Sequence, residues 1–349
     1  MVRASVCQVV IFSSLALAVL MGRDGMASLA QAQDDDQTLK ERFLREAPAR
    51  WAEYAELAKQ VQGTYSFRGS LSPVGVKVEN RSTLKMNRNC KLIEDSAERK
   101  VPGGKGDYQT LTLYALNPHY AFKLRRKNPT SPWYVTEVVD LRTDSLPPEI
   151  QHEFQVFERC VLELVSLGPD PLVELLGKPE FRVVRCRRVL QDGEELVAVD
   201  FDYPHTADAQ DSGIQGGTLV LDPRRFWCLR SYEVQFRSIS AQGTRTYRVL
   251  ELEEAKGGFP LPKRTTELID ILMNDGTKRK NESWRDCNLH IPSRLSSDEE
   301  FTLSAFGFPE PLGVSWSRPT RWYLWLSLAG VLCLAGGGVF YWLKRRAAT

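Results

Sequence analysis

The sequence is poor in the residues and motifs on which enzymes and metal sites depend. It has four histidines, and none stands at metal-ligand spacing from another histidine, a cysteine or a carboxylate. It contains no G-x-S-x-G elbow, no Walker loop, no G-x-G-x-x-G loop and no C-x-x-C pair. We therefore predict no catalytic residue, no metal site and no cofactor, and we expect that the protein is not an enzyme.

Two histidines and one group of carboxylates are the weak exceptions. His119 follows Asn117-Pro118, where a surface or capping role is favoured over catalysis. His205 precedes Asp208 and Asp211, which makes it a metal candidate, although a solvated loop is the favoured reading. Four carboxylates flank one expected hairpin: Glu194, Glu195, Asp200 and Asp202. Nothing in the sequence pairs them across a cleft as a glycosidase requires, so a hydrolase is the least favoured function class.

The composition also limits the partners. The net charge is +2, and acidic and basic residues are interspersed, so we predict no nucleic-acid partner. A hydrophobic content of 42% with 26% charged residues suits a folded region with a real core. Of seven cysteines, Cys7 and Cys333 lie in terminal apolar segments, which leaves an odd number between them. We expect these mainly as small buried hydrophobes, with one or two disulfides permitted by export. The oligomeric state is not indicated.

The N-terminus has the order of features found in signal peptides. A basic start at Arg3 is followed by the apolar run Val6–Met21 and by the A-x-A site Ala30-Gln31-Ala32. We predict a signal peptide over residues 1–32. Cleavage after Ala27 and an uncleaved anchor are the alternatives.

The C-terminus carries the second long apolar segment, Trp322–Leu343, which contains no charged residue. At about 1.5 Å per residue, such a helix covers about 33 Å, close to a hydrocarbon core of about 30 Å. Aromatic residues at both of its ends and the cluster Lys344-Arg345-Arg346 behind it favour a membrane span with a cytoplasmic tail, residues 344–349. Arg318 and Arg321 on the other side weaken this charge bias, and a buried core helix is the alternative. The sequence thus predicts a single-pass membrane protein whose ectodomain is exported, on the periplasmic side of a bacterial inner membrane.

Between these ends the hydrophobic period changes three times. Residues 37–62 repeat apolar side chains every three or four positions, which predicts a helix that Pro48 divides and Gly63 ends. From Thr64 to Leu141 the period is two, which predicts antiparallel strands with one sheltered face. A helical insert over Ile150–Val165 and a short helix over Pro171–Leu176 follow.

Seven further strands are expected after the insert. Asp192-Gly193 and Asp275-Gly276 predict two of the hairpin turns between them. The expected strands are Phe181–Leu190, Glu195–Tyr203, Thr218–Leu221, Arg225–Phe236, Thr244–Glu254, Leu261–Leu272 and Thr277–Asn288. Residues 33–290 would form the ectodomain, and residues 291–321 a polar linker to the span.

This order of elements resembles the exported lipoprotein-carrier (LolA-like) family. Leu84–Asn89 is similar to the strand and basic turn that follow the family's first hairpin, and Tyr108–Leu116 with Asn117-Pro118 is similar to its strand that ends in an Asn-Pro turn. The resemblance implies an α+β fold, mainly antiparallel β, in which an open curved half-barrel holds helices in its mouth. It implies a basic turn at Arg88, although the family's Arg-Pro pair is Arg88-Asn89 here.

In such a fold, alternating apolar residues of the first strands would line a ligand cavity on the concave face. These residues are Tyr65, Phe67, Leu111, Leu113, Tyr120 and Phe122. The alternative is that they pack under the helical segments. We therefore expect a membrane-anchored protein that binds an acyl chain, another apolar ligand or a lipoprotein. The competing hypothesis is a structural or protein-interaction module of the cell envelope without a small ligand.

The tail has a second resemblance. Pro309-Glu310-Pro311, an apolar segment and terminal arginines are similar to a bacterial Pro-Glu-Pro sorting signal, after which the C-terminal segment would be processed. In that class the triad lies closer to the apolar segment than it does here, and a plain anchor is the favoured reading.

Overall fold

The computed structural model describes residues 36–71, 76–99, 108–203, 213–255, 257–314, 330–333, 336–337 and 346. The chain divides into two compact units, Met1–Phe301 and Thr302–Thr349. The expected signal peptide, His205 and most of the expected membrane span lie outside the described residues.

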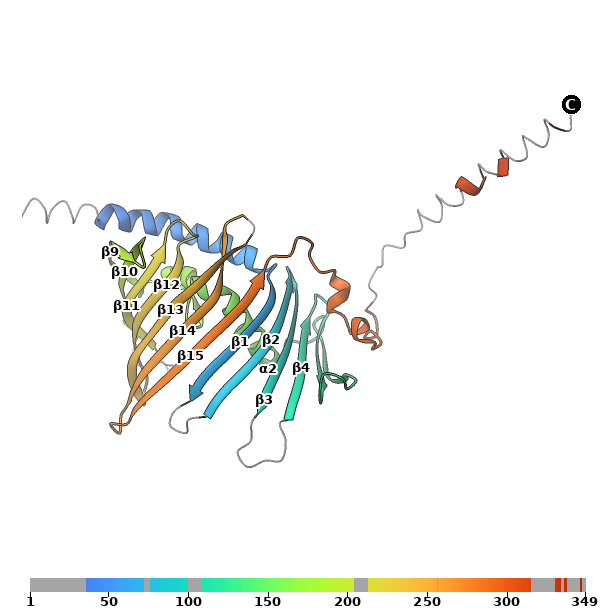
Figure 1. The fold of residues 1–349 in the computed structure, drawn as a ribbon, viewed down its shortest axis with the longest axis horizontal. Coiled ribbons are helices and arrows are strands. Elements are labelled where there is room, and N and C mark those ends of the chain that lie inside the picture. Colours follow the sequence, from blue (N-terminus) through green and yellow to red (C-terminus); the bar gives the residue numbers. More distant parts are fainter. Residues whose placement is uncertain are drawn as a thin grey trace, which may run out of the picture. The chain divides into compact units, whose positions relative to one another are not determined.

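A single antiparallel sheet of 13 strands dominates the first unit (Figure 1). Its first six strands are β1 (Gln62–Leu71), β2 (Val76–Asn87), β3 (Cys90–Arg99), β4 (Tyr108–Leu116), β5 (Tyr120–Arg126) and β6 (Tyr134–Asp140). The other seven are β9 (Arg182–Gln191), β10 (Glu194–Asp202), β11 (Gly213–Asp222), β12 (Cys228–Arg237), β13 (Ala241–Ala255), β14 (Phe259–Met273) and β15 (Lys278–His290).

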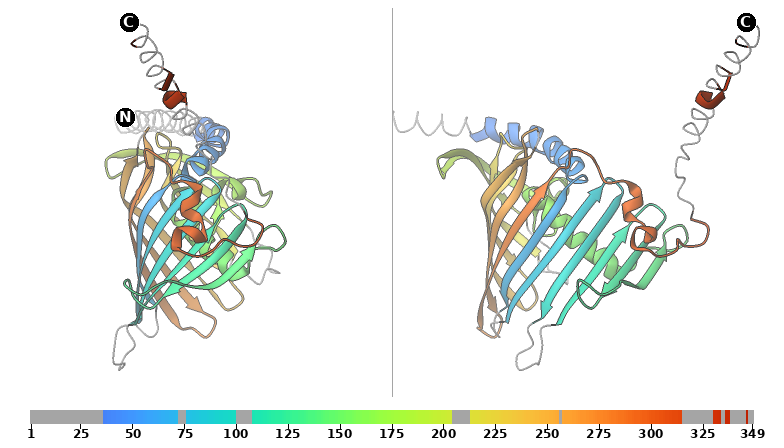
Figure 2. Two further views of the ribbon diagram at one scale, coloured as in Figure 1. Left: turned by 90° about the vertical axis from the view of Figure 1, so that its right-hand side faces the viewer. Right: turned by 45° about the vertical axis from the view of Figure 1, so that its right-hand side comes forward.

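Chain neighbours are sheet neighbours throughout, and the pairing of β1 with β15 joins the two halves of the sheet. Strands β6 and β9 form its two open edges. The sheet curves strongly, so one face is concave (Figure 2). The expected order of antiparallel strands, a helical insert and seven further strands is confirmed, as is the mainly antiparallel, open architecture.

The helical insert lies on the concave face. It consists of α2 (Pro148–Leu162), the 3-10 turn η1 (Glu163–Val165), the two-stranded hairpin β7 (Ser166–Leu167) and β8 (Asp170–Pro171), and α3 (Leu172–Leu176). Pro148 stands at the start of α2, where its missing N–H leaves no hydrogen bond unmade. Phe157 of α2 packs edge-on against Tyr65 of β1, with ring centroids 6.4 Å apart. The insert therefore covers part of the concave face while the rest stays open.

The N-terminal helix runs without interruption over residues 36–58, so the expected division at Pro48 is wrong. A proline inside a helix removes one hydrogen bond and costs about 3 kcal/mol. Here Phe43, Ala47, Trp51 and Tyr54 on both sides of Pro48 are buried in the core, and this packing outweighs the loss. In Figure 1 the helix lies across one end of the strands.

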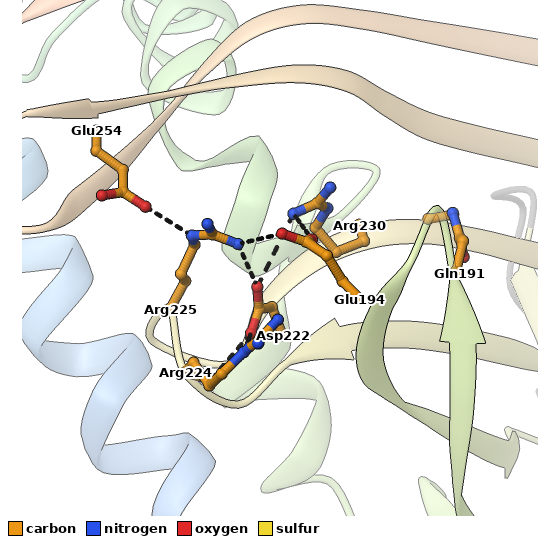
Figure 3. A network of polar contacts seen from close by, with 8 residues as sticks. Gln191, Glu194, Asp222, Arg224, Arg225, Arg230 and Glu254 are labelled. Carbon is orange, nitrogen blue, oxygen red and sulfur yellow. Dashed lines mark hydrogen bonds and ion pairs between the residues drawn. The ribbon is translucent and has the colours of Figure 1, made fainter.

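A network of ion pairs stabilises the β11–β12 turn, against which the N-terminal helix packs (Figure 3). The carboxylate of Asp222 is fully buried, and Arg225 Nη1 lies 2.8 Å from its Oδ2 and 3.1 Å from Glu194 Oε1. The β11–β12 turn that follows places Phe226 and Trp227 at φ 57° and 54°, a left-handed conformation that is strained for such residues. Residues 225–227, expected as the start of a strand, therefore form a turn.

Within the described residues of the first unit, all five cysteines are buried and unpaired: Cys90, Cys160, Cys186, Cys228 and Cys287. They serve as small apolar side chains, as the composition suggested. The disulfides that export would permit are not formed among the described residues.

The chain after β15 continues over the convex face of β2 and β3. The side chain of Asn87 donates a hydrogen bond of 2.7 Å to Ser296 O, and Lys85 pairs with Glu300 at 3.2 Å. Phe301 ends the 3-10 turn η2 (Asp298–Phe301) and is fully buried. This part of the expected linker thus belongs to the compact first unit.

The second unit begins with the 3-10 turn η3 (Leu303–Phe306). The carboxylate of Glu310, the centre of the Pro-Glu-Pro triad, accepts a hydrogen bond of 2.8 Å from Ser304 N. Residues 330–333 and 336–337 of the expected span are helical. Over the part of the chain that is described, no helix has the length and apolar character needed to cross a membrane.

Candidate functional site

A cavity of about 860 Å³ opens on the concave face, between the helical insert and the sheet. Its floor is formed by β11 to β15 and by Tyr65 of β1, and its roof by α2, η1 and the β7–β8 turn. Two smaller hollows, of about 580 and 440 Å³, lie at the β12–β13 and β14–β15 hairpin tips and are lined mainly by exposed residues. The concave cavity is therefore the candidate site.

Arg285 of β15 is the centre of the charges in this cavity. Its Nη1 lies 3.2 Å from Glu163 Oε2 of η1, and its Nη2 lies 3.2 Å from Glu267 Oε2 of β14. Glu267 also accepts a hydrogen bond of 3.1 Å from the Tyr232 hydroxyl and lies 3.6 Å from Arg245 Nε. Burial opposes the charge of Arg285, but the two glutamates raise its pKa well above the usual value.

Glu163 is the carboxyl group of this cluster whose protonation changes near neutral pH. Burial raises its pKa to about 7, and the attraction of Arg285 only partly offsets this effect. Its Oε2 faces Arg285, whereas its Oε1 is buried without a hydrogen-bond partner. The hydroxyl of Tyr247, on the neighbouring floor of the cavity, is likewise buried and without a partner. A buried polar group without a hydrogen-bond partner lowers the stability of a core that serves packing alone, and such groups are typical of functional sites.

Strand register divides the floor into a polar and an apolar part. Tyr247 stands opposite Glu267 and Tyr232, towards the end of the strands covered by the N-terminal helix. Two positions along β13, Arg245 stands opposite Val234 and Ile269. Two positions further, towards the hairpin tips, Gly243 stands opposite Phe236 and Ile271. The four apolar partners of Arg245 and Gly243 all line the cavity: Val234, Phe236, Ile269 and Ile271. Arg245 therefore marks the boundary between the two parts.

Of the six residues expected to line the cavity, Tyr65 does so. Phe67 shares its face, because side chains two positions apart on a strand point the same way, and it packs against the core at the level of Arg285.

The other four residues lie on the opposite face. Strand pairing places Ser82 of β2, Asp95 of β3, Thr112 of β4 and Arg125 of β5 on the same face as Tyr65. Residues at the alternate positions of β4 and β5 therefore point to the convex side. Four of them are the expected cavity residues, and all are buried there: Leu111, Leu113, Tyr120 and Phe122.

Arg88 does stand in a basic turn, between β2 and β3, in a left-handed conformation with φ 51°. Its backbone N–H donates a hydrogen bond of 2.9 Å to Lys59 O at the end of the N-terminal helix. Its side chain is exposed and is not part of the cavity.

The weaker candidates are engaged elsewhere. Glu194 belongs to the network of Figure 3, Glu195 pairs with Arg188 at 2.7 Å, and Asp200 pairs with Arg187 and accepts a hydrogen bond from Thr218. His119 lies in the turn that Asn117 closes with its side-chain oxygen. Among the described residues no group of three histidines, cysteines or carboxylates is placed to hold a metal ion.

The charged cluster is what the sequence did not reveal. Glu163 and Arg285 are 122 positions apart, and no pairing rule joins them in one dimension. A usable signal existed in β14, where Thr265, Glu267 and Ile269 occupy alternate positions on one face. A carboxylate at a sheltered position of a strand is costly without a partner, so it marks a site.

Comparisons with known proteins give distant similarities. No protein-family model matches the sequence, and no protein with a curated description matches it. A solved structure described as a DUF1329 family protein from Desulfovibrio piger has a TM-score of 0.35 and 10% identity, and the match covers 75% of this chain and 99% of that one. A putative outer membrane lipoprotein-sorting protein domain from Vibrio parahaemolyticus has a TM-score of 0.36 and 8% identity, with coverage of 76% and 100%. At these scores the similarities do not establish family membership.

Proposed function

We propose that this protein is an exported, membrane-anchored half-barrel that binds an acyl chain, or the acylated end of a lipoprotein, in its concave cavity. The observation that carries the proposal is the cavity itself. Its volume of about 860 Å³ lies within the range of about 300–1,000 Å³ typical of small-molecule sites. Its apolar part, around Phe236, Ile269 and Ile271, offers a surface for a chain, and the open side of the sheet offers a route of entry.

Export and anchoring rest on the terminal segments. The signal-like residues 1–32 and the apolar residues 322–343 with their basic tail support this part of the proposal. In cells, protease added from the periplasmic side should digest the region between residues 33 and 320 and spare the end with Arg345 and Arg346. Protection of the large region would contradict the proposed orientation.

A second candidate function has one specific observation in its favour. Strand β6 is an open edge of the sheet and exposes the apolar side chains of Tyr134, Val135 and Val138. Open edges accept an added strand from a partner protein. In this case the half-barrel would be an interaction module, and the cavity would hold only water.

The experiment that separates the two functions fills the cavity. Ile269 lines it, whereas the adjacent Leu268 points to the convex face of the same strand. We expect Ile269→Trp to weaken binding of a fluorescent C16 acyl probe at least about tenfold, because the indole occupies the space of the chain. Leu268→Trp is the matched control and should bind like the wild type.

The full-length protein, held in amphipathic polymer to avoid competing detergent, is suitable for a fluorescence anisotropy titration. Native mass spectrometry of the same preparation should detect co-purified lipid. Absence of both co-purified lipid and probe binding would reject the carrier function in favour of the interaction module.

A further inference from the structure

The charges that line the cavity are not balanced. Its lining contains four cationic and three carboxylate side chains. They are Arg159, Lys178, Arg245 and Arg285, and Glu163, Asp170 and Glu267. Two of the carboxylates, Glu163 and Glu267, are both bonded to Arg285. Three cations of the lining therefore remain: Arg159, Lys178 and Arg245. Asp170 is the other acidic group of the lining.

Among the described residues, two of these cations form no ion pair. Arg159 stands in the last turn of α2 and is half-buried, and Lys178 follows α3 at the exposed rim. Neither lies within 4.0 Å of a carboxylate in the described part of the chain. A half-buried guanidinium without a counter-ion is unfavourable unless water or an anionic ligand solvates it.

Arg245 is the third cation and is partly buried. Its Nε is buried without a hydrogen-bond acceptor, at 3.6 Å from a Glu267 oxygen that Tyr232 already occupies. The β7–β8 turn lies directly against its guanidinium, because a Cβ atom on Gly168 would lie 2.7 Å from Arg245 Nη1. Arg245 is thus fixed at the boundary between the polar and the apolar part of the floor.

We propose that the ligand is an amphiphile with an anionic headgroup, a phosphate or a carboxylate, held by Arg159 and Arg245 with its chain along Ile269, Ile271 and Phe236. This inference rests on the proposed function and names the class of ligand. Guanidinium groups bind both kinds of anion through paired N–H donors, which makes arginine well suited to either headgroup. In this placement the head lies at the boundary that Arg245 marks, next to the tyrosines and the Arg285 cluster, and the chain extends along the apolar part of the floor.

The test compares two probes that differ only in charge: a fluorescent C16 fatty acid and its methyl ester. With the full-length protein in amphipathic polymer, we expect the acid to bind at least about tenfold more tightly than the ester. The double variant Arg159→Gln/Arg245→Gln should remove this preference and leave the affinity for the ester unchanged. The matched control is Arg188→Gln/Arg248→Gln, since Arg188 and Arg248 are exposed arginines outside the cavity lining, and it should keep the preference.

Each outcome has one meaning. Equal affinity for the acid and the ester overturns the anionic headgroup and leaves acyl binding intact. Binding of neither probe rejects the proposed function itself. Lysophosphatidic acid and inorganic phosphate serve as competitors: displacement by the lipid alone supports the amphiphile, whereas equal displacement by both would show a site for the free anion. Unchanged preference in the double variant would show that these two arginines are not the headgroup site.

Discussion

Arg285 Nη1 donates a hydrogen bond of 3.2 Å to Glu163 Oε2 and so joins the last strand of the sheet to the segment that covers its concave face. The two residues are 122 positions apart in the chain, and both side chains are largely buried. A buried ion pair of this kind adds little net stability, because desolvation offsets the attraction. Its consequence is a dependence of stability on pH.

Glu163→Gln should change that dependence in a defined direction. The pKa of Glu163 is about 7 in the folded protein against an ordinary value of 4.5, so between these pH values the folded state retains a proton that the unfolded state releases. The contribution of this raised pKa to the free energy of unfolding is therefore complete below pH 4.5 and is lost as the pH rises through 7. We expect the free energy of unfolding of the wild type, relative to the variant, to fall by up to about 3 kcal/mol across this window.

Guanidinium unfolding at pH 4.5, 6 and 7.5 measures this difference. Glu195→Gln, at an exposed position of the β9–β10 hairpin, is the control and should run parallel to the wild type. A constant difference between the wild type and Glu163→Gln at all three pH values would contradict the shifted pKa.

Two substitutions of Trp51 should weaken the packing of the N-terminal helix to different extents. Its indole Nε1 donates a hydrogen bond of 2.9 Å to Trp227 O, and the side chain is 2% exposed. Trp51→Phe keeps most of the packing but leaves a buried carbonyl group unpaired, which costs about 1–3 kcal/mol. Trp51→Ala also opens a cavity and should cost about 3–5 kcal/mol. Denaturant unfolding measures both losses; no loss in Trp51→Phe would mean that the hydrogen bond contributes nothing, and equal losses would mean that the packing of the ring contributes nothing.

Asp222→Asn tests the network that fixes the β11–β12 turn. The Asp222 side chain is fully buried beside Arg225, which is 28% exposed, so Asp222→Asn removes a buried carboxylate from the ion pairs of that partly buried guanidinium. We expect a loss of about 3–5 kcal/mol. Glu254 is bonded to the same Arg225 but is 54% exposed, and Glu254→Gln should cost less than about 1 kcal/mol. Similar losses for the two variants would show that the burial of Asp222 is not what matters.

The buried cysteines should resist alkylation while the protein is folded. Burial raises the pKa of Cys160 and Cys228 to about 12 each, so almost no thiolate exists at pH 8. Mass spectrometry after iodoacetamide treatment should find these two unmodified, and modified once guanidinium is added. The guanidinium-treated sample is the control that both thiols can be alkylated once they are accessible. Rapid modification of Cys160 or Cys228 in the folded protein would contradict this packing.

Much of the fold could be predicted from hydrophobic period and turn residues. Asp192-Gly193 predicted a hairpin, and the structure has a tight turn there with φ 53° and 80°. The start of β11 was missed because Gly216 and Gly217 lack side chains that would show an alternation. A Cβ on Gly217 would lie 2.2 Å from Glu233 O, so glycine is required there for close strand approach.

The face of each strand could not be predicted in the same way. Period two shows that Leu111 and Leu113 share a face with one another, but not which face. That choice depends on the register across each hairpin, and a shift of one residue exchanges the two faces. For the same reason the sequence placed an apolar cavity under β4 and β5, whereas the cavity lies on the other half of the sheet, between the helical insert and β11 to β15, and is partly charged.

Photolabelling tests the central claim, binding of a ligand chain within the concave cavity, most directly. A C16 fatty acid with a diazirine near the end of its chain should be incubated with the full-length protein, irradiated and mapped by peptide mass spectrometry. We predict labels on the cavity-lining residues Phe236, Ile269 and Ile271, and their loss in Ile269→Trp but not in Leu268→Trp. Labels on the convex face, for example at Leu250 or Trp284, with the cavity residues unmodified, would contradict the account.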